Sequence, residues 1–352
     1  MRACARQFGT GGGRMMKIAR AFVAAVLAML AVCGMARAQD ADARAKLNRN
    51  PDRAKFVTSD LDNFLRAYAL ASRASTDAEK IAIYQREYLD KGSPGLKDFV
   101  DARIKSAANL VHAIDTHPKY YASVGSVIPQ IAPMEPAMRA SFRKLKKLYS
   151  DAVFPDVYFL VGVMNSGGTT GPSGLLIGLE MHAKTATTDM SEMDSWLKAV
   201  LGPPEQLPGI VAHELTHYQQ ITTDPKTLLA ASIIEGSADF VGEMTSGQNV
   251  NQGMNQNIYA YGNAHEGELW REFSTEMNGT DFSHWLYQGD KSKDRPADLG
   301  YFMGYQITGT YYKHTADKRQ ALRDILTVTD FPAFLRESHY ADKFASTNAG
   351  TE

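Results

Sequence analysis

The stretch IVAHELTHYQ, residues 210–219, decides how we interpret the chain, because it contains the pattern His-Glu-x-x-His. On a helix, four residues advance about 6 Å and turn about 400°, so His213 and His217 lie one turn apart on the same face. Two imidazoles placed in this way can both reach one tetrahedral zinc ion. Glu214 is displaced from that face, but its carboxylate can reach a water molecule on the metal and accept a proton from it.

The residues around this motif favour a buried helix. Ile210, Val211, Ala212 and Leu215 are apolar, and Pro208 suits the first turn of a helix. Burying two histidines and a glutamate without a metal would cost on the order of several kcal/mol in unmet polar groups. The alternative is an accidental match on a surface helix.

A third ligand is expected from the next helical segment, which runs through residues 228–239. Glu235 lies 18 residues after His217, a separation that allows an antiparallel helix to return past the first one. Asp239 follows one turn later on the same face and can accept the second N–H of a ligand histidine. Glu235 and Asp239 could instead form a solvated acidic face.

Together, residues 213–217 and 235–239 resemble the gluzincin metallopeptidases, the thermolysin-like clan. The form E-G-x-A-D and a later G-Y-x-x-G-Y at residues 300–305 are more narrowly similar to a family of predicted bacterial zinc-dependent proteases, which is itself similar to the gliding-motility B lipoproteins. The resemblance covers roughly residues 157–312.

The resemblance implies a role for each residue of the motif. His213, His217 and Glu235 would bind Zn²⁺, Glu214 would be the general base, and Asp239 would orient a ligand histidine. The resemblance also implies that residues 153–345 fold as a zincin-like catalytic core.

Such enzymes usually add a donor that stabilises the oxyanion of the tetrahedral intermediate. We expect Tyr305 or Tyr301 to be that donor, with Tyr305 favoured; both could equally be core tyrosines. Gluzincins also tend to bind the substrate backbone along an edge strand, and Leu175–Leu179 suits that role. The loop Asn165–Gly171 could overhang the cleft or be a plain connector.

The pattern over the whole chain predicts an α+β fold that is mostly helical, with a small central β-sheet. Helical periodicity dominates, and capping-box pairs at Ser59 and Thr76 predict helix starts. The apolar runs 157–163 and 175–179, separated by Gly-rich residues, predict a hairpin or two neighbouring strands. We divide the chain into a signal peptide (1–38), an N-terminal helical region (39–152), a metallopeptidase core (153–345) and a tail (346–352).

The first 38 residues have the parts of a secretory signal peptide: a basic start at Lys17 and Arg20, an apolar run, and small residues around 36–38. They carry six basic groups and no acidic one, although the whole chain has a formal net charge of −1. A membrane anchor is the alternative. A lipid anchor at Cys33 is disfavoured, because the preceding Val32 is bulky for such a cleavage site. We therefore expect export to the periplasm or beyond, with no stable membrane span after cleavage.

Three functions are compatible with these patterns. The first is a secreted or periplasmic zinc peptidase that acts on a peptide or protein substrate. The second is a non-catalytic envelope protein with a structural zinc site in a motility or secretion assembly, and the third is a metal-free helical binding module. The balanced charge argues against nucleic acid as the partner. The substrate and the oligomeric state are not determined by these patterns.

Overall fold

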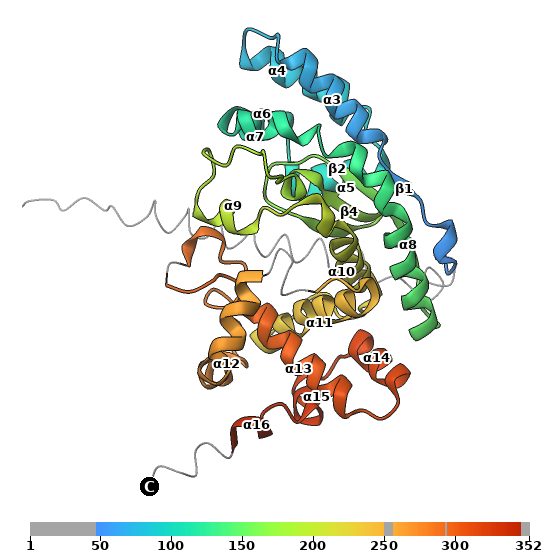
Figure 1. Cartoon of the computed structure of the whole chain (residues 1–352), viewed down its shortest axis with the longest axis vertical. Coiled ribbons are helices and arrows are strands. Elements are labelled where there is room, and N and C mark those ends of the chain that lie inside the picture. The colour runs from blue at the N-terminus through green and yellow to red at the C-terminus, as the bar shows by residue number, and fades with distance from the viewer. Residues whose placement is uncertain (1–46, 250–255, 293, 346–352) are drawn as a thin grey trace, which may run out of the picture.

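A small mixed sheet lies among the helices of the molecule (Figure 1). The computed structural model describes residues 47–249, 256–292 and 294–345. Four strands pair in the order β1-β2-β4-β3, and their bounds are Phe56–Val57 (β1), Asp156–Leu160 (β2), Gly168–Gly171 (β3) and Gly174–Gly178 (β4). The predicted α+β class, mostly helical with a small central sheet, is confirmed.

The two predicted apolar strands are neighbours, but they run parallel. The register pairs Val157 of β2 with Leu175 of β4. The Gly-rich stretch between them supplies β3, which pairs antiparallel with β4. Our expectation that residues 175–179 form the edge strand is therefore wrong: β4 lies between β2 and β3, and β3 is at the edge. The reason is that Gly168–Gly171 forms ladder hydrogen bonds instead of remaining a loop.

Gly174 makes the tight connection between β3 and β4 possible. Its φ is 151°, and a Cβ at this position would lie 2.1 Å from the carbonyl oxygen of Asp156. Only glycine fits this close approach of two backbones without displacing β2.

Helices of the N-terminal region pack on the sheet and on one another. Their bounds are Ser59–Ala71 (α3), Asp77–Tyr84 (α4), Pro94–Phe99 (α5), Ala107–Thr116 (α6), Pro118–Val124 (α7) and Ile131–Leu148 (α8), with π-helical turns at Gln85–Leu89 (η2) and Val100–Ile104 (η3) and 3₁₀ turns at Pro51–Arg53 (η1) and Ile128–Gln130 (η4). Thr76 and Glu79 form the predicted capping box. The box predicted at Ser59 is wrong, because Thr58 is the N-cap of α3 and its side chain makes no capping hydrogen bond.

The second half of the chain forms a stack of helices around α10 and α11. The bounds are Leu179–His182 (η5), Ser195–Val200 (α9), Pro204–Gln206 (η6), Leu207–Gln219 (α10), Leu228–Ser246 (α11), Gln256–Glu276 (α12), Gly289–Lys291 (η8), Gly300–His314 (α13), Lys318–Thr327 (α14), Phe331–Ser338 (α15) and Asp342–Ala345 (α16). α11 begins after a Thr227 cap that accepts from the Ala230 N–H.

Glycines allow α11 and α13 to cross almost backbone to backbone. A Cβ on Gly236 would lie 2.0 Å from the Tyr305 nitrogen, and a Cβ on Gly304 would lie 1.7 Å from the Ser232 oxygen. The Gly-Tyr repeat of α13 therefore has a packing reason. The glycines face α11, and this crossing brings the neighbouring Tyr301 close to His213, with ring centroids 6.4 Å apart.

The predicted N-terminal and core regions share the sheet, because β1 comes from the first and pairs with β2 of the second. The boundary at residue 152 stays a prediction. The predicted signal peptide and tail lie outside the described residues. None of the helices within the described ranges has the length and apolar character needed to cross a membrane.

Candidate metal centre

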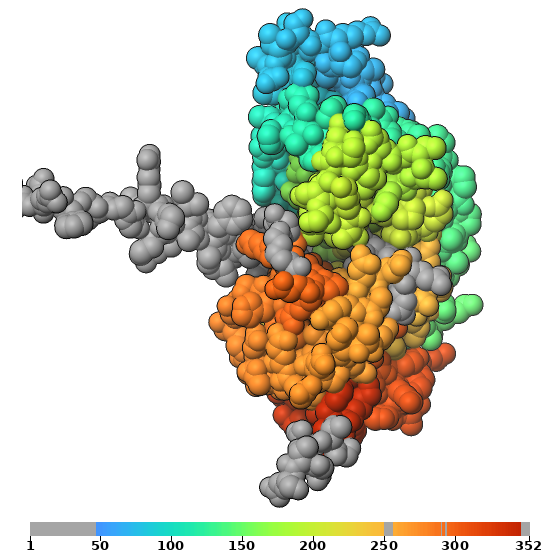
Figure 2. Space-filling model, turned by 60° about the vertical axis from the view of Figure 1, so that its left-hand side comes forward, coloured from blue at the N-terminus to red at the C-terminus, as the bar shows by residue number. Residues whose placement is uncertain are grey.

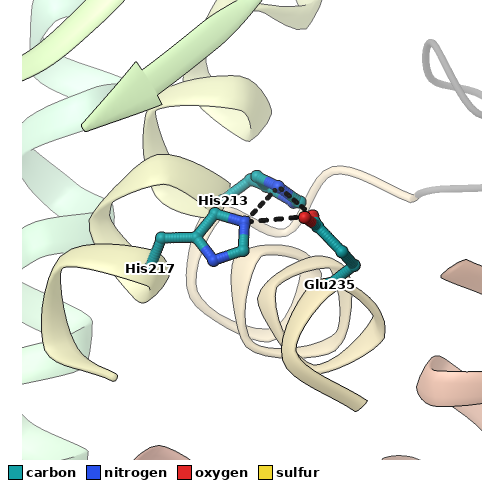
Figure 3. Close-up of side chains that lie close together, drawn as sticks. All are labelled: His213, His217 and Glu235. Carbon is teal, nitrogen blue, oxygen red and sulfur yellow. Dashed lines mark hydrogen bonds and ion pairs between the residues drawn. The ribbon is translucent and has the colours of Figure 1, made fainter. Parts of the chain in front are cut away.

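Two antiparallel helices bring three metal-binding side chains to one point. His213 and His217 come from α10 and Glu235 from α11 (Figure 3). The two Nε2 atoms are 3.0 Å apart, and Oε2 of Glu235 lies 3.2 Å from Nε2 of His217 and 3.9 Å from Nε2 of His213. Ligands of a tetrahedral zinc at about 2.0–2.1 Å stand about 3.3 Å apart, so this triangle has the size of a zinc site.

Each histidine is held by its other ring nitrogen. Nδ1 of His213 lies 2.8 Å from Oδ1 of Asp239, and Nδ1 of His217 lies 2.8 Å from Oε1 of Gln220. Both partners are acceptors, so each Nδ1 carries the proton and each Nε2 of a neutral ring presents a lone pair. Two lone pairs 3.0 Å apart repel one another unless a cation or a proton lies between them. The donor set therefore fits a divalent metal such as zinc.

The charges around His213 and Glu235 also favour a positive charge at the centre of the triangle. Burial opposes protonation of His213, but the hydrogen bond to Asp239 and the charges of Asp239, Glu214 and Glu235 outweigh it and raise the pKa of His213 to about 9. Burial also opposes ionisation of Glu235, yet the nearby imidazoles lower the pKa of Glu235 to about 2. In the metal-free chain a proton thus takes the place that a metal would fill.

Glu214 is buried between the metal triangle and the edge strand. The residue is 6% exposed, and it lines the same cavity as His213 and His217. A Cβ on Gly168 of β3 would lie 2.5 Å from Oε1 of Glu214, so the strand passes directly against this carboxylate. Any larger residue at position 168 would displace Glu214.

The two tyrosines expected from the Gly-Tyr repeat have different surroundings. The ring of Tyr301 is nearly parallel to that of His213, and its nearby hydroxyl helps to lower the pKa of the Glu235 carboxyl. The hydroxyl of Tyr305 instead donates to Oε2 of Glu243 at 3.1 Å, while its ring packs edge-on against Tyr259 and Phe240. The structure thus brings Tyr301 to the metal triangle and directs Tyr305 to another carboxylate.

Sequence reasoning missed three residues that contact this group. Gln220 orients His217, and its Nε2 is itself fixed by the Ile234 oxygen at 2.8 Å. Tyr259 donates to Oδ2 of Asp239 at 2.7 Å, and Tyr287 donates to Oε1 of Glu235 at 2.9 Å. Gln220 could have been found, because it lies one helical turn after His217. The two tyrosines come from distant segments, and no local pattern marks them.

The triangle opens into a large cavity of about 1860 Å³. Its walls include Trp196 of α9, Tyr261 of α12 and all of β3. In Figure 2 the yellow-green part of the chain, which includes α9, faces the orange part, which includes α12. Sites for small ligands are typically about 300–1,000 Å³. This volume suits an extended chain better than a small molecule.

Comparison with protein families identifies the group to which the chain is related. Residues 53–342 match the family model described as gliding motility protein GldB. The chain belongs to this family. The match supports the resemblance to gliding-motility B lipoproteins, and the relation to gluzincins stays a prediction. No curated protein and no solved structure matches the chain.

The GldB match includes all residues of the metal triangle and most of the N-terminal helices. The family therefore extends well beyond the residues from 157 onward on which the sequence resemblance was based. Within the described ranges, the group that could hold a metal consists of His213, His217 and Glu235.

Proposed function

We propose that this member of the GldB family is an exported zinc-dependent peptidase of the cell envelope. One observation carries the proposal: two histidines with fixed Nδ1 atoms and one carboxylate converge on a point beside a buried glutamate, at the base of a cavity. A structural zinc site usually has four protein ligands, whereas a catalytic one has three and exchanges the fourth.

His213, His217 and Glu235 would hold the metal. A zinc ion bound there would act as a Lewis acid and lower the pKa of a bound water to about 7. Glu214 takes the proton of the attacking water and later delivers it to the leaving amine. Asp239 and Gln220 keep the two imidazoles in the tautomer that presents Nε2 to the metal.

The edge strand β3 offers a place for the substrate backbone. Gly178 N–H donates to the Gly167 oxygen, so Gly167 and Gly178 form a hydrogen-bonded pair of the antiparallel ladder. By alternation, the backbone groups of Gly168 and Thr170 point away from β4, towards the open edge. The Gly168 oxygen accepts from Ser166, so Thr170 is the residue best placed to bind an extended peptide.

A second function is favoured by the family match. The family description names gliding motility, and the same helices could carry a structural zinc site in a motility assembly. In that case Glu214 would have no proton to transfer, and its burial beside the ligands would be incidental.

Export is supported by the family model, whose short name marks a lipoprotein family. That name gives no support to our expectation that Cys33 carries no lipid. Cys33 lies outside the described residues.

The experiment that separates the two functions is a peptide-library digest analysed by mass spectrometry, with the zinc-loaded protein, the chelator-treated protein and Glu214→Gln. We expect cleavage by the zinc-loaded protein alone. Glu214→Gln should retain one zinc per chain and lose at least about 1,000-fold in turnover, since it cannot accept the proton. Full turnover in this variant, or no cleavage by the zinc-loaded wild type, would refute the peptidase.

A further inference from the structure

Tyr287 is an exposed aromatic residue whose hydroxyl is directed at a metal ligand. It lies in the segment between α12 and α13, and its side chain donates to Oε1 of Glu235 at 2.9 Å. It is 47% exposed, one of few large apolar residues with such exposure among those that the structure describes. It also lines the cavity, together with Glu214 and His213.

The backbone around Tyr287 is built to hold this position. Its φ is 58°, in the left-handed region that a bulky residue rarely adopts. Two reciprocal hydrogen bonds of 3.0 Å stabilise the segment, from Gln288 N to Oδ1 of Asp298 and from Asp298 N to Oε1 of Gln288. A strained residue that its surroundings hold in place, at the wall of a candidate active site, points to a function for its side chain.

Tyr287 and Tyr301, the two tyrosines near Glu235, differ in their surroundings. Tyr301 projects from α13 and packs against the ring of His213. Tyr287 projects from a loop, and the residue is about half exposed. The exposed side of Tyr287 therefore faces the solvent at the cavity wall, whereas the ring of Tyr301 is packed on an imidazole.

Glu235 does not need Tyr287 in order to bind a metal. Oε2 is the oxygen that faces the two imidazoles, while Tyr287 occupies Oε1. The hydroxyl can leave Oε1 and donate to another oxygen that enters the cavity, without removing the carboxylate from the triangle.

We propose that Tyr287 is a catalytic residue that exchanges its hydrogen bond from Glu235 to the carbonyl oxygen of the bound substrate. There it donates to the negative charge that develops on this oxygen in the tetrahedral intermediate, while Tyr301 stays packed on His213. The proposal rests on the proposed peptidase function. It assigns the donor to a residue outside the Gly-Tyr repeat from which we first expected it.

The test compares Tyr287→Phe with a control, Tyr312→Phe, whose ring packs on Phe240 at the far part of α13. The substrate is a library peptide that the wild type cleaves, and the second probe is a phosphinic analogue of that peptide, which mimics the tetrahedral anion. Zinc affinity is measured by chelator competition.

For Tyr287→Phe we expect a fall in kcat of about 100-fold and a similar loss of affinity for the phosphinic analogue, the usual effect of removing one oxyanion donor. Zinc affinity should change by less than the roughly 10-fold that loss of a ligand-orienting partner causes. Tyr312→Phe should behave as the wild type.

Two results would overturn the assignment. The first is wild-type kcat in Tyr287→Phe, and the second is a loss of zinc affinity that accounts for the whole loss of turnover, which would make Tyr287 only an orienting partner of Glu235. If the zinc-loaded wild type neither cleaves peptides nor binds the phosphinic analogue, the peptidase function itself fails, and this inference fails with it.

Discussion

Two buried polar networks of this protein differ in how their polar atoms are paired. In the metal triangle, Nε2 of His213, Nε2 of His217 and Oε2 of Glu235 converge on one point, and the two nitrogens of neutral rings would repel one another there unless a cation or a proton lay between them. Beside the sheet, in contrast, the hydroxyls of Tyr88, Tyr120 and Tyr121 each donate to a backbone carbonyl, at 2.8–2.9 Å. The point in the first network calls for a cation, whereas the three hydroxyls of the second already have acceptors within the protein.

The second network holds the segment that leads to the edge strand. Its tyrosines come from the N-terminal helices, and their acceptors are Val161, Gly162 and Glu180. From the same 3₁₀ turn as Glu180, Nε2 of His182 contacts the Gly167 oxygen at 3.0 Å. Burial lowers the pKa of His182 to about 4, so the ring is neutral and donates this bond. The N-terminal helices thus support β3, and α10 and α11 carry the metal triangle.

The largest effect on stability that we expect from this contrast concerns Glu180, which is fully buried. Its oxygens accept from Gly162 N and Met164 N, but burial outweighs these bonds and raises its pKa to about 7, from 4.5. The folded state therefore disfavours the charged form. Protonated Glu180 therefore contributes its full amount to the free energy of unfolding below pH 4.5. This contribution, roughly 3 kcal/mol, is lost as the pH rises from 4.5 to about 7.

This pH dependence can be isolated by urea unfolding between pH 4.5 and 8. The wild type should lose stability relative to Glu180→Gln as pH rises, while the exposed control Glu268→Gln should follow the wild type. A difference between Glu180→Gln and the wild type that is constant over this pH range would contradict the assignment.

A smaller effect is expected at Asp239, which belongs to the first network. Asp239→Asn removes the negative charge that holds Nδ1–H of His213, so zinc affinity should fall about 10–100-fold with little change in fold. Asp324→Asn is a matched control, because Asp324 also accepts a tyrosine hydroxyl, from Tyr311 at 2.9 Å, yet lies outside the cavity walls. Equal zinc affinity in Asp239→Asn and the wild type would show that Asp239 does not orient the ligand.

The smallest effect should come from Tyr121→Phe in the second network. The Gly162 carbonyl would lose its donor, which should lower the free energy of unfolding by about 1 kcal/mol. Zinc affinity, measured by chelator competition, should be unchanged. A fall in zinc affinity comparable to that of Asp239→Asn would break the distinction between the two networks.

Local sequence was enough to predict the features that depend on helical spacing. His213 and His217 face one point because they are four residues apart on α10, and Glu235 with Asp239 repeats this spacing on α11. The capping box at Thr76 likewise depends on residues three apart. The predicted strand segments depended on β-rich runs, and the strands β2 and β4 overlap them, each beginning one residue earlier than predicted.

Only the tertiary structure decided which strand forms the edge and which tyrosines reach the metal triangle. The position of β3 depends on pairing with β4, and a Gly-rich stretch carries no apolar alternation that would reveal it. Tyr287 lies 52 residues from Glu235, and the two meet because α13 crosses α11 at its glycines and the Gln288–Asp298 pair fixes the intervening loop. Spacing along one helix is determined by covalent geometry, whereas contacts between distant segments depend on how whole surfaces pack.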